Sequence, residues 1–109
     1  MAISGLYELE PCRLNYVNDK LKLTRDEQLA LSPIRHLPAS SPPLAIAFGT
    51  GELPEMQRQS RDYAAARHAA KLPTQELPLA GHDHYSILEE LARPDGALTQ
   101  CLVEMAGKR

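Results

Sequence analysis

The amino-acid sequence predicts an α/β fold built on about three parallel strands with flanking helices. Three short segments, at residues 2–7, 44–48 and 74–79, have the apolar or alternating character of strands. Segments with helical spacing separate these strands and follow the last one. Strands and helices that alternate in this way form a parallel sheet through right-handed crossovers. A chain of 109 residues corresponds to one domain, predicted over residues 1–109.

The clearest strand is the continuous apolar run Leu44–Phe48, which is closed by Gly49-Thr50-Gly51. An uninterrupted run is typical of a strand buried on both faces of a parallel sheet. The first strand starts at Ala2 and runs into a loop by Tyr7. Thr74–Leu79 alternates in polarity, and Pro78 restricts it to an edge because proline donates no backbone hydrogen bond.

Capping residues and apolar spacing predict the helices. Thr24 and Glu27 have the spacing of a capping box, which predicts a helix over residues 25–31. Pro54 suits a first helical turn and predicts a helix over residues 55–71. The apolar side of that helix is expected to contain Met56, Tyr63, Ala66 and Ala70. Apolar spacing also indicates helices over residues 12–23 (Leu14, Val17, Leu21), 84–92 and 97–106.

Charge and hydropathy argue against several classes of protein. The formal net charge is −2 and the basic residues are scattered, so neither nucleic acid nor a membrane surface is an expected partner. No run is long enough to cross a bilayer and no secretion signal is evident, so the expected location is cytoplasmic. Cys12 and Cys101 are expected to be free thiols. Gly49-Thr50-Gly51 lacks the third glycine of a dinucleotide loop, and no cofactor is expected.

Titratable side chains follow two of the predicted strands, at the ends where parallel sheets collect functional groups. Glu52 and Glu55 come after the central strand. Either could be structural, Glu52 as a solvated loop charge and Glu55 as compensation for the helix dipole. His84 follows the last strand and could act as a general base, or could be a solvated loop histidine. His82 and His84 flank Asp83, but ligands from one tight turn rarely converge on one ion, so no metal is expected.

Nucleophiles are scarce. The sequence contains no Gly-x-Ser-x-Gly, the pattern that places a serine on a sharp turn between strand and helix. Neither cysteine has a histidine beside it in the sequence. The residues by themselves therefore offer an acid and a base without a group to attack a carbonyl.

Five segments together resemble one group of proteins: Ile3–Pro11, Ser32–Arg35, Pro43–Gly49, Glu52–Tyr63 and Gly81–Glu89. They are similar to segments of α/β-hydrolases of the arylformamidase (kynurenine formamidase) and carboxylesterase group. The helix start at residues 57–61 and the turn at residues 83–88 are specific in combination. The resemblance covers nearly the whole chain and implies a partial α/β-hydrolase fold, corresponding to the C-terminal strands six to eight and their helices.

The resemblance also implies roles for individual residues. In that group the catalytic triad runs serine, acid, histidine along the chain. The acid of the group corresponds to the position four residues before Met56, which implies Glu52. Because the group often has aspartate there and this sequence has glutamate, Glu55 is the alternative acid. The position before the Tyr-Ser-Ile-Leu run implies His84 as the base, and His82 inherits no role. The substrate class that follows is a small-molecule ester or N-formyl amide.

In the group the serine nucleophile and oxyanion hole come from an N-terminal half that this sequence does not contain. The chain is therefore expected to be inactive alone, as a truncated form or one half of a split hydrolase. A standalone binding or interaction domain is the alternative. The first strand is expected to lack a neighbour on one side, and an unpaired edge favours association. We therefore expect a homodimer, with residues 2–7 as the candidate contact edge, or else poor solubility.

Overall fold

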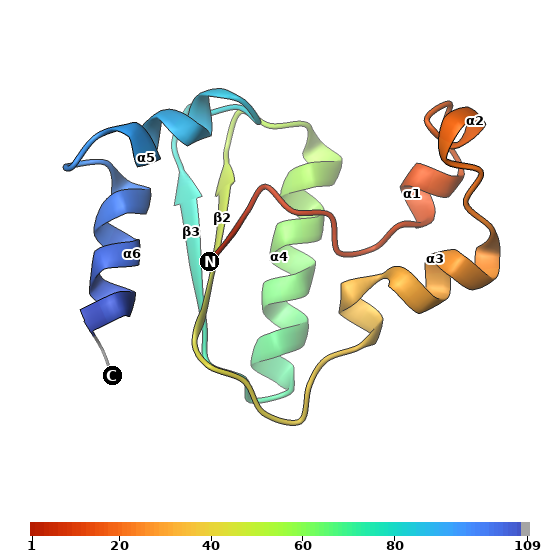
Figure 1. The fold of residues 1–109 in the computed structure, drawn as a ribbon, viewed down its shortest axis with the longest axis horizontal. Coiled ribbons are helices and arrows are strands. Elements are labelled where there is room, and N and C mark those ends of the chain that lie inside the picture. The colour runs from red at the N-terminus through yellow and green to blue at the C-terminus, as the bar shows by residue number, and fades with distance from the viewer. Residues whose placement is uncertain (108–109) are drawn as a thin grey trace.

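The structure is a computed structural model that describes residues 1–107, so the last two residues of the predicted domain lie outside it. Its elements are, in chain order, β1 (Ala2–Ile3), α1 (Glu10–Arg13), α2 (Asn18–Leu21), α3 (Arg25–Leu31), the 3-10 turn η1 (Pro33–Arg35), β2 (Leu44–Gly49), α4 (Pro54–Ala69), β3 (Thr74–Leu79), the 3-10 turn η2 (Ser86–Leu88), α5 (Glu89–Ala92) and α6 (Ala97–Gly107). The three strands are parallel and lie in the order β1-β2-β3. The predicted α/β fold is confirmed and is consistent with a partial α/β-hydrolase fold (Figure 1).

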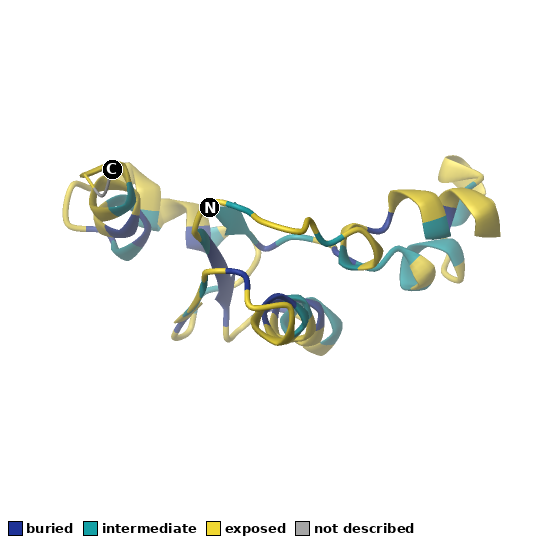
Figure 2. Ribbon diagram, turned by 90° about the horizontal axis from the view of Figure 1, so that it is seen from below, coloured by how far each residue is buried: buried dark blue, intermediate teal, exposed yellow. Residues whose placement is uncertain are grey.

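The central strand β2 is apolar throughout because helices cover both of its faces. Ile46 packs with Ala64 of α4 and with Tyr7 on one face. Ala47 packs with Leu98 of α6 and with Ile87 of η2 on the other. Alternate side chains of a strand point to opposite faces, so a strand between two helical layers needs apolar residues at every position. Figure 2 shows α4 and α6 on either side of the sheet, with the buried positions gathered between them.

Helix α4 begins at Pro54 as predicted, but the expected apolar side is wrong. Its buried residues are Gln59, Ser60, Ala64 and Arg67, whereas Met56, Tyr63 and Ala66 are half-buried and Ala70 is exposed. Polar side chains occupy this face because they hold neighbouring loops. Gln59 accepts hydrogen bonds from backbone amides, and Arg67 binds Ser41, Thr74 and the carbonyl of Pro73.

The predicted continuous helix over residues 12–23 is also wrong. The chain forms α1 and α2 instead, and α2 ends at Lys22, which has a left-handed backbone with φ of +51°. The side chains of Leu14, Val17 and Leu21 therefore do not pack into a core. They are 67%, 37% and 57% exposed. Together with α3, these helices extend away from the sheet (Figure 1). We call residues 10–31 the helical arm.

The capping box that was predicted for α3 is confirmed. The Thr24 hydroxyl accepts from the Glu27 amide, and the Glu27 carboxylate accepts from the Thr24 amide. The predicted helix over residues 84–92 begins later than expected, at η2. The Asp83 carboxylate accepts from the amides of Tyr85 and Ser86, which closes a tight turn before the helical segment. That turn leaves His84 in a loop.

Two further findings concern the described residues. Within residues 1–107, no helix has both the length and the apolar content needed to span a membrane. Cys12 is half-buried and Cys101 is buried, and both are free thiols as predicted.

Candidate functional site

Backbone hydrogen bonds join the loop after β2 to the loop after β3. The Thr50 amide donates to the carbonyl of Leu79 at 3.0 Å, and the Gly51 amide donates to the carbonyl of His82 at 2.9 Å. The Thr50 hydroxyl accepts from the Gly81 amide at 2.9 Å. The parallel register brings both strand ends to one edge of the sheet, and these bonds then fix the two loops against each other.

Glu52 and His84, the two predicted site residues, meet at this edge. His84 Nδ1 lies 3.0 Å from Glu52 Oε1. The Glu52 side chain is fully buried, whereas that of His84 is 51% exposed. With Nδ1 turned toward a buried carboxylate, Nδ1 is the donor and Nε2 of the neutral ring is available as a base. The arrangement is that of an acid–base pair in which only the base meets solvent.

The second oxygen of Glu52 is held by two further donors. Glu52 Oε2 accepts from the Gly49 amide at 2.6 Å and from the Ser4 hydroxyl at 2.8 Å. Ser4 was not among the predicted site residues, because 48 residues separate it from Glu52 in sequence. Its position directly after the first strand is the signal that could have found it, since parallel strand ends share one edge of the sheet.

Gln57 supports the same loop from the first turns of α4. Its side-chain amide donates to the carbonyl of Glu52 at 2.7 Å and to the carbonyl of Thr50 at 3.1 Å. The side chain and the backbone of Glu52 are thus both fixed by hydrogen bonds. A buried carboxylate that is held at several points keeps its orientation without help from solvent.

Glu55, the alternative acid, lies outside this arrangement. Its carboxylate binds the guanidinium of Arg58 and accepts from the Gln59 amide at 3.1 Å. The hydrogen bond from Arg58 is the main reason that the pKa of Glu55 is lowered. The geometry therefore pairs His84 with Glu52, and it gives Glu55 a place in an ion pair on the surface of α4.

His82 is bound on both ring nitrogens, away from His84. Its Nδ1 lies 3.1 Å from the Ser86 hydroxyl and its Nε2 lies 3.0 Å from Glu90 Oε1. Both contacts are within the loop and helices that follow β3. Within residues 1–107, no three His, Cys, Asp or Glu side chains are grouped closely enough to hold a metal ion.

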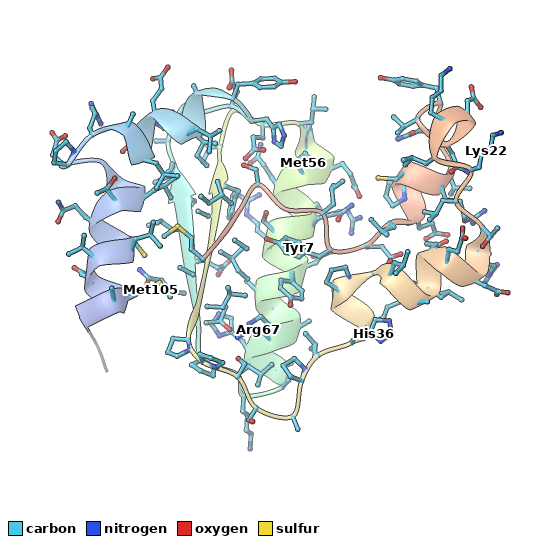
Figure 3. All side chains as sticks on the ribbon, viewed as in Figure 1. Tyr7, Lys22, His36, Met56, Arg67 and Met105 are labelled. Atoms are coloured by element: carbon cyan, nitrogen blue, oxygen red, sulfur yellow. The ribbon has the colours of Figure 1, made fainter. Side chains whose placement is uncertain are left out.

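A hollow of about 330 Å³ opens beside the pair. Its lining residues are Gly51, Glu52, Leu53, Met56, Asp83, His84 and Tyr85. The Tyr85 ring stands edge-on to His84 with 5.4 Å between ring centroids, and it is largely exposed. Figure 3 places Met56 at the start of α4, at the same end of the molecule as the two loops. The hollow combines an apolar wall with one imidazole, as small-molecule sites do.

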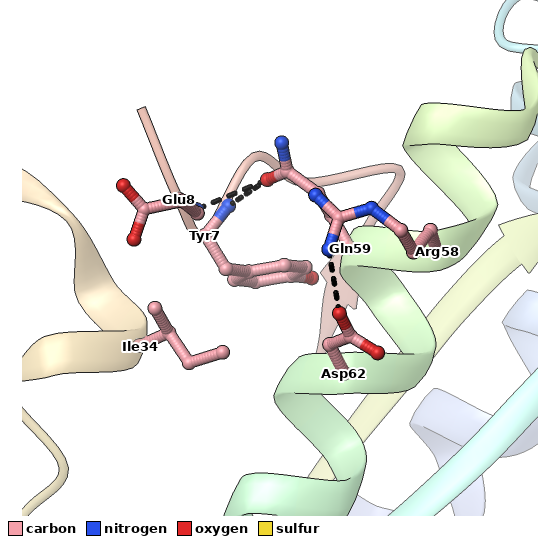
Figure 4. A pocket seen from close by; sticks show the side chains of 6 residues that line it. All are labelled: Tyr7, Glu8, Ile34, Arg58, Gln59 and Asp62. Atoms are coloured by element: carbon pink, nitrogen blue, oxygen red, sulfur yellow. Dashed lines mark hydrogen bonds and ion pairs between the residues drawn. The ribbon is translucent and has the colours of Figure 1, made fainter. Parts of the chain in front are cut away.

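A second contact region holds the segment after β1 in place. Gln59 Oε1 accepts from the amides of Tyr7 and Glu8, at 2.8 and 3.0 Å, in the pocket drawn in Figure 4. The Tyr7 ring stacks on Tyr63 at 4.2 Å between centroids. Burial is the main cause that raises the pKa of Tyr7 to about 12, so this phenol stays neutral at physiological pH. These contacts anchor the segment that carries Ser4 to helix α4.

Comparison with known proteins gives the geometry a context. No protein-family model matches the chain. Kynurenine formamidase of Danio rerio is 34% identical over 111 residues, and kynurenine formamidase of Salmo salar is 34% identical over 114 residues. The chain resembles the kynurenine formamidases. Each alignment covers 97% of this chain, and the chain spans 38% of the length of either relative. The resemblance to the arylformamidase group that was predicted from the sequence is confirmed.

Proposed function

We propose that this chain supplies the acid and the base of a hydrolase catalytic triad, and that its substrates are N-formyl amides or esters. The observation that carries the proposal is the 3.0 Å contact of the buried Glu52 carboxylate with His84 Nδ1. This contact leaves Nε2, on the other side of the ring, available to accept the proton of a nucleophile. The similarity to curated kynurenine formamidases supports the N-formyl amide as substrate class.

In this proposal His84 Nε2 takes the proton of a nucleophilic hydroxyl as the hydroxyl oxygen attacks the carbonyl carbon. The same proton then passes to the leaving amine or alcohol when the tetrahedral intermediate collapses. Glu52 keeps the proton of the neutral ring on Nδ1 and stabilises the imidazolium that forms. The buried position of Glu52 strengthens this interaction, because no water competes for its oxygens.

The attacking hydroxyl is proposed to come from polypeptide beyond these residues. The sequence has no Gly-x-Ser-x-Gly pattern, and within residues 1–107 the hydrogen bonds of His84 include no serine or cysteine. The hydroxyl of Ser4 is engaged by Glu52, and that of Ser86, two residues after His84, is engaged by His82. Without a nucleophile and oxyanion donors, a Glu–His pair loses most of the rate enhancement of a triad.

The apolar wall of the hollow favours an aromatic substrate. Leu53 and Tyr85 are 74% and 82% exposed, and both line the hollow with Met56. Large exposed apolar side chains around a polar centre are typical of ligand sites. An N-formyl group on an aromatic amine would place its ring against this wall and its carbonyl near His84.

A chimera tests the proposed function. Residues 1–107 would replace the matched 38% of the Danio rerio kynurenine formamidase, which retains its own remaining residues. We expect hydrolysis of an N-formyl arylamine by the chimera and none by the isolated chain. Glu52→Gln and His84→Ala should each lower kcat by about 10³-fold or more, while Glu55→Gln leaves it within about twofold. A folded, active chimera that is indifferent to His84→Ala contradicts the proposal.

We also propose that the chain associates with a second copy through the outer edge of β1. That edge has no neighbour among the described residues, since the sheet order is β1-β2-β3. Leu6, which follows β1, is 40% exposed. An unpaired edge with apolar residues beside it favours strand pairing between chains. Light scattering at micromolar concentration should give the mass of a dimer, and a stable monomer there would contradict this proposal.

We also propose a cytoplasmic location, which the two free thiols support. Proteins of reducing compartments keep their cysteines unpaired. Fractionation of cells that express the chain should therefore recover it with the cytoplasmic proteins.

A further inference from the structure

We infer that Ser4 is a positioning residue, whose hydroxyl orients the Glu52 carboxylate so that its other oxygen faces His84. The inference rests on the proposed function and adds a residue to it. Ser4 is buried, and its Oγ donates to Glu52 Oε2 at 2.8 Å. It reaches the site from the first strand, far in sequence from both members of the pair.

The hydrogen bonds of Glu52 are divided between its two oxygens. Oε2 takes both fixed donors, the Ser4 hydroxyl and the Gly49 amide. Oε1 is left for His84 Nδ1. Two donors on one oxygen prevent the carboxylate from rotating about its terminal bond, because rotation would break both of them in a fully buried place. Ser4 therefore acts on His84 through Glu52 and does not touch the reacting atoms.

The backbone of Ser4 supports a role for its side chain. Its φ is +49°, in the left-handed region that residues with a Cβ seldom adopt. The Ser4 amide is fixed there by donation to the carbonyl of Ala47 at 2.8 Å, one residue beyond the pairing of Ile3 with Ala47. Glycine would meet the backbone requirement with less strain. A strained serine that places its hydroxyl on a buried carboxylate is typical of a functional position.

The tautomer of His84 reports this positioning directly. The ring faces Glu52 at Nδ1, the edge of Tyr85, and the hollow that Asp83 also lines. Of these, the Glu52 carboxylate is the group that lies within hydrogen-bond distance of the ring, at 3.0 Å from Nδ1. The neutral ring should hence carry its proton on Nδ1 whenever Oε1 faces it. If the carboxylate turns away, the ring should relax to the mixture of tautomers of a solvated histidine.

Nitrogen-15 NMR of histidine-labelled chain measures the tautomer of His84, assigned through His84→Gln. We expect the Nδ1-protonated form in the unmodified chain, and a loss of most of that population in both Ser4→Ala and Ser4→Gly. Both variants remove the hydroxyl, but Ser4→Gly also relieves the left-handed backbone, so it folds even if Ser4→Ala does not. Ser40→Ala, at an exposed serine, is the control and should leave the tautomer unchanged.

Glu52→Gln separates this inference from the proposed function. Its amide oxygen should remain with Ser4 and Gly49, which turns the NH₂ group toward His84 and moves the ring proton to Nε2. If Glu52→Gln moves the proton while Ser4→Gly keeps the unmodified tautomer, the role of Ser4 is overturned and the acid–base pair stands. If Glu52→Gln changes nothing, the pair itself fails, and both the inference and the proposed function fall.

Discussion

Gly49 lies against the carbonyl oxygen of His82, so closely that a Cβ on Gly49 would overlap that oxygen. The contact joins the end of β2 to the loop that carries His84, while the Gly49 amide donates to Glu52. One glycine thus sets the distance between the two loops and contributes a donor to the acid.

Gly49→Ala should therefore separate the two loops. The methyl group meets backbone atoms that cannot turn aside, and we expect a loss of about 1–3 kcal/mol in the free energy of unfolding. Urea denaturation measures it. Gly107→Ala, whose methyl group meets no atom of the described residues within 4 Å, is the control and should stay within about 0.5 kcal/mol of the unmodified chain. Equal stability of both variants would show that the loops are not in contact.

Glu52→Ala should destabilise the fold more than Glu55→Ala. Removing the buried carboxylate leaves the Gly49 amide and the Ser4 hydroxyl without an acceptor, at a cost of about 3 kcal/mol. The Glu55 side chain is 42% exposed and its ion pair with Arg58 should contribute about 0.5 kcal/mol. Urea unfolding of the two variants side by side tests the difference. A larger loss of stability for Glu55→Ala than for Glu52→Ala would contradict the buried, hydrogen-bonded position of the Glu52 carboxylate.

Glu90 should stabilise the chain in a pH-dependent manner. Donation from the Ala97 amide, followed by the contact with His82, lowers the pKa of Glu90. A carboxyl with a lower pKa in the folded state stabilises that state above its unfolded pKa, and the effect is lost as pH falls through the folded value. The difference in free energy of unfolding between the unmodified chain and Glu90→Gln should hence shrink as pH falls below about 5.

The neighbouring Glu89 provides the comparison for that titration, because it is exposed. Glu89→Gln should show little difference from the unmodified chain at any of these pH values. If the difference in free energy of unfolding between the unmodified chain and Glu90→Gln grows as pH falls, the hydrogen bonds of Glu90 with Ala97 and His82 do not lower its pKa.

Arg67 is a buried cation whose partners are neutral. Its guanidinium binds the hydroxyls of Thr74 and Ser41 and the carbonyl of Pro73, and the residue is 3% exposed. Lysine cannot reproduce the fork that reaches three acceptors, so Arg67→Lys should lower the free energy of unfolding by about 1–3 kcal/mol. Thermal unfolding measures this loss. Arg25→Lys, at an exposed position of α3, should be neutral by comparison.

The sheet could be predicted because its signals are local. The run Leu44–Phe48 is apolar at every position since both faces of β2 are covered, and the Thr24–Glu27 capping box needs only a four-residue window. The predicted helix over residues 12–23 was wrong for the opposite reason. Leu14, Val17 and Leu21 have helical spacing, but spacing does not reveal whether a core exists for them to face.

The geometry of the candidate site was predictable only in part. Glu52 and His84 each follow a predicted strand, and the resemblance to a known family selected them among several charged residues. The choice between Glu52 and Glu55 required the loop geometry, because a difference of three residues decides between a buried carboxylate and a surface ion pair. Ser4 depends on the register of β1 against β2, which emerges only when the sheet is assembled.

Pro78 limits which edge of the sheet can pair with a strand from another chain. It lies on β3, at the edge opposite β1, in register with Phe48. A strand added beside β3 would find no donor at that residue, so β3 is a poor template for another chain. Copies that meet edge to edge are therefore confined to the β1 side. In the proposed association through β1, each copy would contribute one edge of the described sheet, so that contact would close at two molecules and would not extend into a fibre.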